Sequence, residues 1–155
     1  MSSTSDADAE SFFEQTAGGD RMVTQGRTIT EADVTNFAGV SGDFNHLHTD
    51  GARMADSSFG ERIAHGMLVL SAATGLIWQT RSTLERESVV AFYGMDDLRF
   101  TAPTFIGDTI RVEREVLETE RTPDAPGTGT VRYQVDVIKD DETTVLSCEM
   151  TSLVD

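Results

Sequence analysis

One short segment of this chain combines histidine and acidic side chains in a way that no other part of the sequence does. Within eight residues it contains Asp43, Asn45, His46, His48 and Asp50. A carboxylate and an imidazole that meet in one pocket can share a water molecule, because the carboxylate accepts a proton while the imidazole orients the water or returns a proton. Such a pair suits the addition of water across an activated double bond. A capped turn without a catalytic role is the alternative interpretation of the same spacing.

A metal site is another use of these residues. Asp43, His46, His48 and His65 would supply four nitrogen and oxygen ligands, and His46 and His48 would share a face if their segment were extended. No other feature of the sequence fixes a tetrahedral set, so we predict no metal. His46 is then a solvent-facing loop residue, and His65 is hydrogen-bonded within the turn that enters a helix.

His65 and Gly66 lie where a buried helix is expected to begin. Backbone N–H groups in the first turn of a helix have no intrahelical partner and carry partial positive charge, which suits a developing oxyanion. A glycine at this place lets a ligand carbonyl approach the backbone. The alternative is a tight turn that needs glycine for steric reasons alone.

The catalytic segment lies between two predicted helices. Thr30 and Asp33 have the spacing of a helix start, and the first helix is expected to end near residues 40–42. Residues 43–63 are predicted to be a long loop with short helical pieces, since glycine and serine interrupt them. Residues 66–81 are apolar on nearly every face, which predicts a buried helix.

The remainder of the sequence predicts an antiparallel sheet. The expected strands are one short strand within 22–30, and then 88–93, 96–102, 109–122, 129–138 and 143–154. One buried helix followed by an antiparallel meander predicts an α+β fold in which the sheet wraps around the helix. Such a sheet leaves strand edges and apolar surface exposed, so we expect the chain to dimerise.

The length of 155 residues fits a single domain. Residues 1–20 are rich in Ser, Asp, Ala and Gly, which predicts a flexible acidic N-terminal arm ahead of one domain at 21–155. The N-terminus lacks the features of a secretory signal, and no apolar run reaches the ~20 residues that span a bilayer, so we expect a cytoplasmic location. Cys148 is the only cysteine and is interpreted as a small buried residue.

The charge balance is strongly acidic. The chain has 27 Asp and Glu against 12 Lys and Arg, a formal net charge of −15. This charge repels phosphate backbones and anionic lipids, so nucleic acids and membrane surfaces are not expected as partners. In molar salt the screening length falls to about 3 Å, which removes most of the repulsion within a compact acidic fold. We therefore predict a halophilic protein; an ordinary acidic protein is the alternative.

Three stretches of the sequence resemble a known family. Residues 37–48 are Phe-Ala-Gly-Val-Ser-Gly-Asp-Phe-Asn-His-Leu-His, residues 59–68 are Phe-Gly-Glu-Arg-Ile-Ala-His-Gly-Met-Leu, and residues 100–109 are Phe-Thr-Ala-Pro-Thr-Phe-Ile-Gly-Asp-Thr. In this order they resemble the MaoC-like dehydratases and (R)-specific enoyl-CoA hydratases. The resemblance implies a hot-dog fold and a homodimer or higher homo-oligomer with active sites near the interface. It also implies a lyase of fatty acid metabolism that hydrates trans-2-enoyl-CoA reversibly to (3R)-hydroxyacyl-CoA.

The same resemblance implies roles for single residues. Asp43 and His48 would hold and activate the water, and Asn45 would support them by hydrogen bonding. His65 and Gly66 correspond to the family's His-Gly at the helix start, with the Gly66 amide as the oxyanion donor for the thioester. No cofactor is implied, because CoA is part of the acyl-CoA substrate.

Two positions depart from the family's pattern. Thr74 falls where similar hydratases have a serine near the site, so a hydroxyl is kept. His46 stands where the family usually has proline, whose ring would hold φ near −65°. Without that ring, either His48 is held less firmly or a titratable group is added at the mouth of the pocket.

Two other functions remain open. A hot-dog acyl-CoA thioesterase would direct water at the thioester carbonyl and release a free thiol. A non-catalytic acyl-CoA-binding or regulatory subunit would bind the ligand without turning it over. Four arginines either meet the phosphates of CoA or are surface charges: Arg53, Arg62, Arg81 and Arg99.

The halophilic prediction is tested by thermal melts in increasing KCl. Because salt screens the repulsion of a charge of −15, the melting temperature should rise between dilute buffer and molar KCl. A melting temperature that stays constant or falls over this range would show that the charge serves another purpose.

Overall fold

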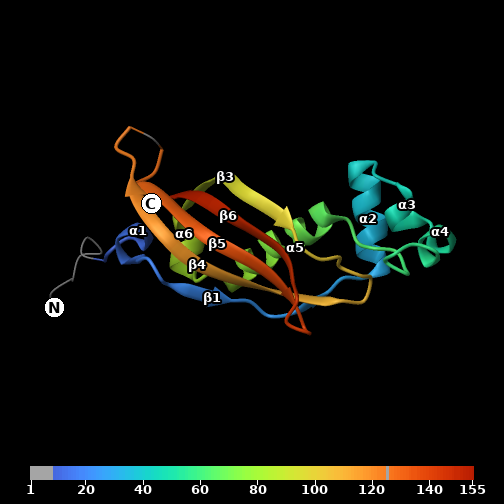
Figure 1. The fold of residues 1–155 in the computed structure, drawn as a ribbon. Helices are drawn as coiled ribbons and strands as arrows, with labels where there is room; N and C mark the ends of the chain where they lie inside the picture. The colour runs from blue at the N-terminus through green and yellow to red at the C-terminus, as the bar shows by residue number, and fades with distance from the viewer. Residues whose placement is uncertain (1–8, 125) are drawn as a thin grey trace, which may run out of the picture.

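The computed structural model describes residues 9–124 and 126–155. Within them, six strands form one antiparallel sheet, and the longest helix, α5, lies against one of its faces (Figure 1). The elements in chain order are α1 Phe12–Gln15, β1 Arg21–Val23, β2 Arg27–Thr28, α2 Glu31–Ser41, α3 His46–Thr49, α4 Gly51–Ala55, α5 Gly66–Thr80, α6 Thr83–Ser88, β3 Val89–Phe100, β4 Thr109–Arg121, β5 Gly129–Lys139 and β6 Thr144–Val154.

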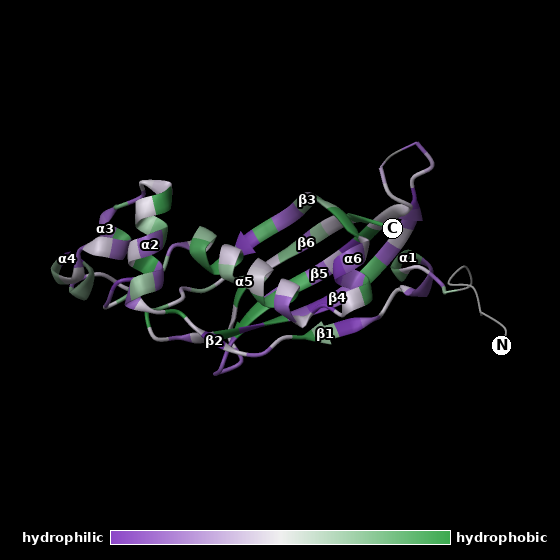
Figure 2. Ribbon diagram, turned by 180° about the vertical axis from the view of Figure 1, so that it is seen from behind, coloured by the Kyte–Doolittle hydropathy of each residue, from purple (hydrophilic) through white to green (hydrophobic). Residues whose placement is uncertain are grey.

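The strands are arranged in the order β1-β4-β5-β6-β3, with β2 also pairing with β4. Buried and partly exposed residues alternate along β4, β5 and much of β6, as the two-residue period of a strand requires, and hydrophobic and hydrophilic colours mix along them in Figure 2. One face of the sheet therefore supplies the core. The prediction of an α+β fold with an antiparallel sheet around a long helix is confirmed.

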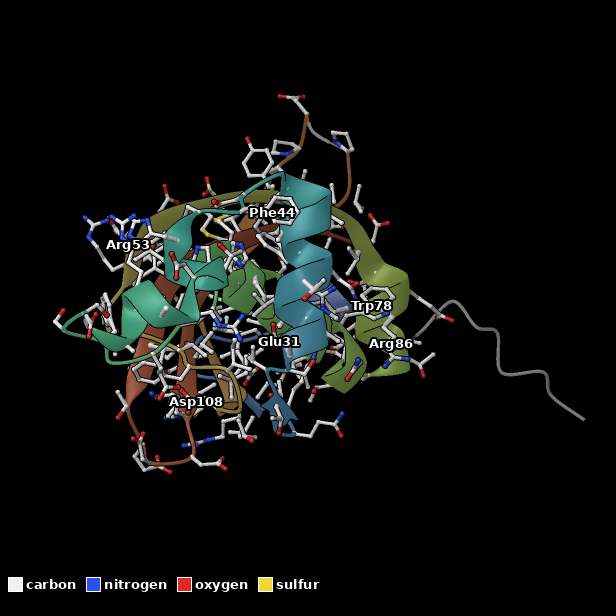
Figure 3. The ribbon with its side chains drawn as sticks, turned by 90° about the vertical axis from the view of Figure 1, so that its right-hand side faces the viewer. Glu31, Phe44, Arg53, Trp78, Arg86 and Asp108 are labelled. Atoms are coloured by element: carbon white, nitrogen blue, oxygen red, sulfur yellow. The ribbon has the colours of Figure 1, made fainter. Side chains whose placement is uncertain are left out.

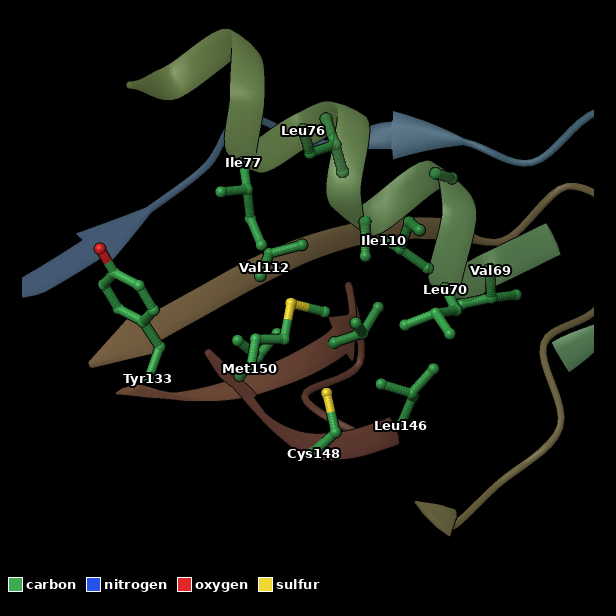
Figure 4. Packing of buried hydrophobic residues seen from close by; sticks show 14 of the residues in the cluster. Val69, Leu70, Leu76, Ile77, Ile110, Val112, Tyr133, Leu146, Cys148 and Met150 are labelled. Atoms are coloured by element: carbon green, nitrogen blue, oxygen red, sulfur yellow. The ribbon is translucent and has the colours of Figure 1, made fainter. Parts of the chain in front are cut away.

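The core lies between α5 and the inner face of β4, β5 and β6. Val69, Leu76 and Ile77 of the helix face Ile110 and Val112 of β4 (Figure 4). Seven of the fifteen residues of α5 are buried, so the helix is held along most of its length by apolar contact. Cys148 of β6 is buried in the same core, as predicted.

The helix before the catalytic segment forms as its capping residues predict. Thr30 accepts a hydrogen bond from the Asp33 amide at 3.2 Å, and the Asp33 carboxylate accepts one from the Thr30 amide at 2.9 Å. At the other end Gly42 adopts φ 74°, a left-handed conformation that glycine reaches at little cost, and stops α2. The chain turns there toward Asp43.

Some elements differ from the prediction. The two strands expected at 88–93 and 96–102 are one strand, β3, whose pairing with β6 is interrupted by register shifts, and Asp97 has a φ of 53°. Residues 83–88 form the helix α6, which the sequence analysis did not identify. Residues 1–8 of the predicted arm lie outside the described residues, but residues 12–15 form α1 and Phe13 is buried in the core. The packed structure therefore starts before residue 21.

The edge of the sheet at β3 is open in a single chain. Apolar side chains are exposed along this strand and on the adjacent face of α5: Met67, Trp78, Val90, Phe92, Tyr93 and Phe100. Unpaired strand edges and apolar patches are the surfaces that proteins cover by association. In residues 9–124 and 126–155, none of the helices combines the length and apolarity that crossing a membrane requires.

Candidate active site

Helices α2, α3 and α4 lie beyond one end of the sheet, next to the N-terminal end of α5 (Figure 1). Glu31 and Phe44 lie at opposite ends of α2 in Figure 3. The segment between α2 and α4 carries the predicted catalytic residues, and the chain then returns through Ile63 to the start of α5. This arrangement brings residues separated by about twenty positions in sequence to one place.

Asp43 is fixed by its neighbour Asn45. The Asn45 side-chain amide donates to Asp43 Oδ1 at 2.7 Å, and the Asn45 backbone N–H donates to the same oxygen at 3.3 Å. These hydrogen bonds lower the pKa of the Asp43 carboxyl below its ordinary value, so it is ionised near neutral pH. The Asn45 side-chain oxygen accepts from the Leu47 amide at 2.9 Å and caps α3, so one side chain holds both the carboxylate and the short helix.

His48 is buried, and one carbonyl fixes its tautomer. Its Nδ1 lies 2.7 Å from the carbonyl oxygen of Ile63. A carbonyl oxygen only accepts, so the neutral ring carries its proton on Nδ1 and leaves Nε2 as an acceptor. Burial lowers the pKa of His48, although the bond to Ile63 raises it, and the neutral ring is favoured.

The two predicted catalytic groups face each other across a gap. His48 Nε2 lies 3.9 Å from Asp43 Oδ2. The distance is too long for a direct hydrogen bond, but one water molecule can donate a hydrogen bond to each atom at once. A water held in this way directs a lone pair away from both acceptors. The structure thus brings Asp43, Asn45 and His48 together as predicted.

His65 contacts both residues of this pair. Its ring stacks on His48 with centroids 3.7 Å apart, and its Nε2 lies 2.9 Å from the backbone carbonyl oxygen of Asp43. Phe37 of α2 covers another part of the ring at 4.9 Å. His65 is 3% exposed, and its Nδ1 has no hydrogen-bond partner among the described residues. It therefore positions the backbone of Asp43 and the ring of His48.

Gly66 is the first residue of α5, and no side chain caps this end of the helix. Its first-turn N–H groups are therefore available to a ligand. A Cβ at Gly66 would lie 2.6 Å from Cε1 of Phe100, so the ring of Phe100 covers this backbone closely. Both interpretations of this glycine are thus compatible: it is sterically required, and it leaves a helix N-terminus open.

A pocket of about 530 Å³ lies next to His48 and Gly66. His48 and Gly66 line it on one side, and mainly apolar residues line the remainder, among them Phe59, Ile63 and Phe100. A cavity of this size and lining is typical of small-molecule sites, with few polar groups to orient the ligand. An acyl thioester fits such a lining better than a polar metabolite does.

The predicted segment 100–109 builds one wall of this pocket. The Ala64 amide donates to the Thr104 carbonyl at 2.7 Å, which ties the wall to the chain just before α5. Asp108 accepts from the Phe105 amide at 2.7 Å and from Lys139 Nζ at 3.1 Å, and Gly107 adopts φ 100° in the same turn. The motif therefore shapes the pocket and supplies no reacting group.

Arg62 and Glu31 also hold the site, which the sequence analysis did not predict. Arg62 donates twice to the Glu31 carboxylate, at 2.9 and 2.6 Å, and once to the backbone carbonyl oxygen of His48 at 3.2 Å. These bonds tie α2 to the helix that carries His48. No sequence signal joins two residues thirty-one positions apart, so only the fold identifies them.

Other candidates lie elsewhere. Thr74 lines a second pocket farther along α5, where its hydroxyl donates to the Ser71 carbonyl at 2.7 Å. Arg81 lines the same second pocket, whereas Arg53 and Arg99 are exposed. His46 is half-buried at the start of α3.

The donor atoms of Asp43, His48 and His65 all lie within 4.8 Å of one another, so this trio is the metal candidate of the described residues. The two imidazole rings stack at an interplanar angle of 26°, so their lone pairs lie in nearly parallel planes, which does not favour a tetrahedral ligand set around one ion. His46 is not part of the trio, and the absence of a metal stays a prediction.

The family model of the MaoC like domain matches residues 12–139. The chain belongs to the MaoC-like family. Over 117 residues it is 42% identical to Protein MaoC of Klebsiella aerogenes, covering 73% of this chain and 34% of that protein, so it spans about a third of the length of that relative. Over 85 residues it is 39% identical to the (R)-specific enoyl-CoA hydratase of Aeromonas caviae, covering 55% of this chain and 60% of that enzyme.

Solved structures agree with this MaoC-like assignment. The monoamine oxidase regulatory protein of Archaeoglobus superposes with a TM-score of 0.84 at 38% identity and covers 92% of both chains. A Mycobacterium tuberculosis protein described as having a double hotdog fold superposes with a TM-score of 0.77 at 20% identity, over 92% of this chain and 43% of that one. The predicted hot-dog fold is confirmed.

The protonation state of His48 in this MaoC-like chain is tested by NMR titration of its imidazole. Because burial lowers its pKa, the midpoint should lie below the ordinary 6.5, with the proton on Nδ1. The unfolded chain then binds more protons in this range, so the free energy of unfolding should fall as the pH drops from 6.5 through the folded pKa. A midpoint at or above 6.5 would contradict the assignment.

Proposed function

We propose that the chain is an (R)-specific enoyl-CoA hydratase, which adds water reversibly to a trans-2-enoyl-CoA and gives a (3R)-hydroxyacyl-CoA. The observation that carries the proposal is the placement of Asp43 Oδ2 and His48 Nε2, 3.9 Å apart, beside an apolar pocket that begins at the open end of α5. An ionised carboxylate and a neutral imidazole are both proton acceptors, which suits them to hold one water molecule by its two hydrogens.

In the hydration direction, Asp43 takes a proton from the water while the water oxygen attacks C3 of the enoyl group. His48 orients the same water through Nε2. The π electrons of the C2–C3 bond move toward the thioester carbonyl, so negative charge develops on its oxygen. The Gly66 N–H, at the positive end of α5, donates to that oxygen. C2 then receives a proton from the set of Asp43, His48 and water, on the face from which the water came.

A homodimer is part of this proposal. The exposed edge of β3 and the exposed apolar residues on α5 lie next to the pocket, and Phe100 belongs to both. A second copy that pairs its own β3 with this edge would continue the sheet across a two-fold axis and cover exposed residues of β3 such as Val90 and Tyr93. A cytoplasmic, halophilic setting and a role in fatty acid metabolism remain predictions from the sequence and its resemblance.

Catalysis is tested with crotonyl-CoA, whose hydration removes the absorbance of its conjugated thioester. Asp43→Asn and His48→Ala should each lower the rate by about 10²-fold or more, because the first removes the base that takes the proton of the water and the second removes the acceptor that orients it. Asp56→Asn and His46→Ala remove a carboxylate and an imidazole of the same segment outside the catalytic set, and serve as matched controls. Undiminished turnover in both catalytic variants would reject the assignment. Free thiol release would identify a thioesterase, and binding without turnover a regulatory subunit.

Assembly is tested by size-exclusion chromatography with light scattering in molar KCl. The expected mass is at least twice the 16.9 kDa of one chain. Tyr93→Asp places a charge at an exposed residue of β3 and should shift the protein toward the monomer. Val40→Asp makes the same change at an exposed apolar residue on α2, away from β3, and should not. A monomeric wild-type chain would contradict the proposed dimer.

A further inference from the structure

A second pocket, of about 320 Å³, opens between the C-terminal half of α5 and the edge strand β3. Its apolar lining includes Ile77, Trp78, Phe92 and Met150. Its charged lining consists of Arg81, just after α5, and Arg114 of β4. We call this cavity the arginine pocket. It lies outside the set of residues that the proposed hydration uses.

The two arginines share a single carboxylate. Arg114 donates to both oxygens of Glu85, at 2.7 and 3.3 Å. Arg81 Nε lies 3.2 Å from Glu85 Oε1, within ion-pair distance but without hydrogen-bond geometry. The side chains of Arg81, Arg114 and Glu85 are only 15%, 8% and 7% exposed. Two guanidinium groups share one carboxylate in this cluster, which therefore carries an excess of one positive charge.

An excess positive charge in a largely buried cluster is costly, because the protein interior does not replace the water that the guanidinium groups have lost. Burial lowers the pKa of Arg81 while Glu85 raises it and Arg114 lowers it, which reflects this cost. The neighbouring Tyr133 does not neutralise the charge, since burial raises its pKa to about 12 and keeps the phenol protonated. Carboxylates are abundant in this chain, yet within residues 9–124 and 126–155 Glu85 is the one carboxylate that forms an ion pair with either arginine.

The form of the pocket suits an organic carboxylate. A guanidinium presents a planar fork of donors that matches the two oxygens of a carboxylate. Trp78 lies 5.4 Å from the Arg81 guanidinium, which holds that fork against an aromatic face. The hydroxyl residues Thr74 and Ser152 add polar groups, and the apolar lining suits a methylene chain. The volume lies at the lower end of the range for small-molecule sites.

The arginine pocket lies along the same two elements as the catalytic pocket. Gly66 and Phe100 line the catalytic pocket, and Thr74 and Phe92 line the arginine pocket, so both open between α5 and β3. Gly66 and Thr74 are eight residues apart on one helix, a separation of about 12 Å along its axis. An extended acyl chain can run along this path from one pocket to the other.

We propose that the arginine pocket binds the carboxylate end of an acyl chain whose thioester end occupies the catalytic pocket. The preferred substrates are then enoyl-CoA thioesters of dicarboxylic acids, not of simple fatty acids. The acyl part of this inference rests on the proposed hydratase function. The carboxylate site itself does not, because it is defined by Arg81, Arg114 and Glu85 alone.

Binding is tested without catalysis through Trp78, the only tryptophan of the chain. Titration with hexanedioate or octanedioate should change its fluorescence to saturation, whereas the diols of equal length should not. Arg81→Met keeps much of the side-chain volume and leaves Arg114 paired with Glu85, so the fold should persist, which a thermal melt checks. The dissociation constant should rise by about tenfold or more, the loss of one charge-assisted contact.

Arg86→Met is the matched control. Its guanidinium lies 5.7 Å from the same Trp78 ring, but Arg86 does not line the pocket and donates only to the Trp78 and Gln79 carbonyls. The dissociation constant should be unchanged in this variant. Arg81→Lys, which keeps the charge but loses the fork, should fall between the wild type and Arg81→Met. Equal binding of diols and dicarboxylates, or binding that is insensitive to Arg81, overturns the carboxylate site.

Turnover tests the acyl part. The substrates are pairs of 2-enoyl-CoAs of six to twelve acyl carbons, in which one member ends in a carboxylate and the other in a methyl group. At one length, kcat/KM for the carboxylate member should exceed kcat/KM for the methyl member by about tenfold, which corresponds to about 1.4 kcal/mol. The ratio of these two values should fall toward one in Arg81→Met and persist in Arg86→Met. A preference for the methyl group at every length overturns the inference while the hydratase stands. Dicarboxylate binding without hydration of any enoyl-CoA rejects the hydratase and the acyl part, and keeps the carboxylate site.

Discussion

Helix α5 has to satisfy two opposing demands. Seven of its residues are buried against β4, β5 and β6, so the apolar contact fixes its position and direction. Its first turn, by contrast, has no side-chain cap, and a pocket lies beside Gly66 at this end of the helix. Because the rest of α5 is buried, its open N-terminal end is held in a fixed position. Asp43, His48 and the wall at 100–109 are all placed relative to that end.

Asp43 and His48, which lie near the open end of this helix, differ in burial and in hydrogen bonding. Asp43 is exposed and is kept ionised by hydrogen bonds from Asn45, whereas His48 is buried and kept neutral. The two groups therefore have different protonation preferences while only 3.9 Å apart, which is the condition under which both accept from one water. The predicted salt dependence of the fold rests on the acidic composition of the chain. This composition does not determine the chemistry of either pocket, because each depends on buried or hydrogen-bonded groups.

Local signals in the sequence predicted the elements that local interactions form. The Thr30–Asp33 capping box and the apolar residues of α5 each act over a few positions, and the structure contains them as expected. Long-range contacts were not predictable in this way: Arg62 with Glu31, and Arg114 with Glu85, are each about thirty residues apart. The Arg81–Glu85 pair has i,i+4 spacing and was visible in principle. Helix α6 was missed because a six-residue helix carries too little periodicity to identify.

His46 shows how the loop keeps its shape without the proline that the family usually has there. It is the first residue of α3, where a proline is favoured because the N–H of that position has no intrahelical partner. Histidine at this position therefore breaks no hydrogen bond; what is lost is the fixed φ of the ring. Side chains replace that constraint: Asn45 caps the Leu47 amide, Thr49 donates to the Asn45 carbonyl, and Arg62 donates to the His48 carbonyl. These three hydrogen bonds hold the backbone around His48 in place of the proline ring.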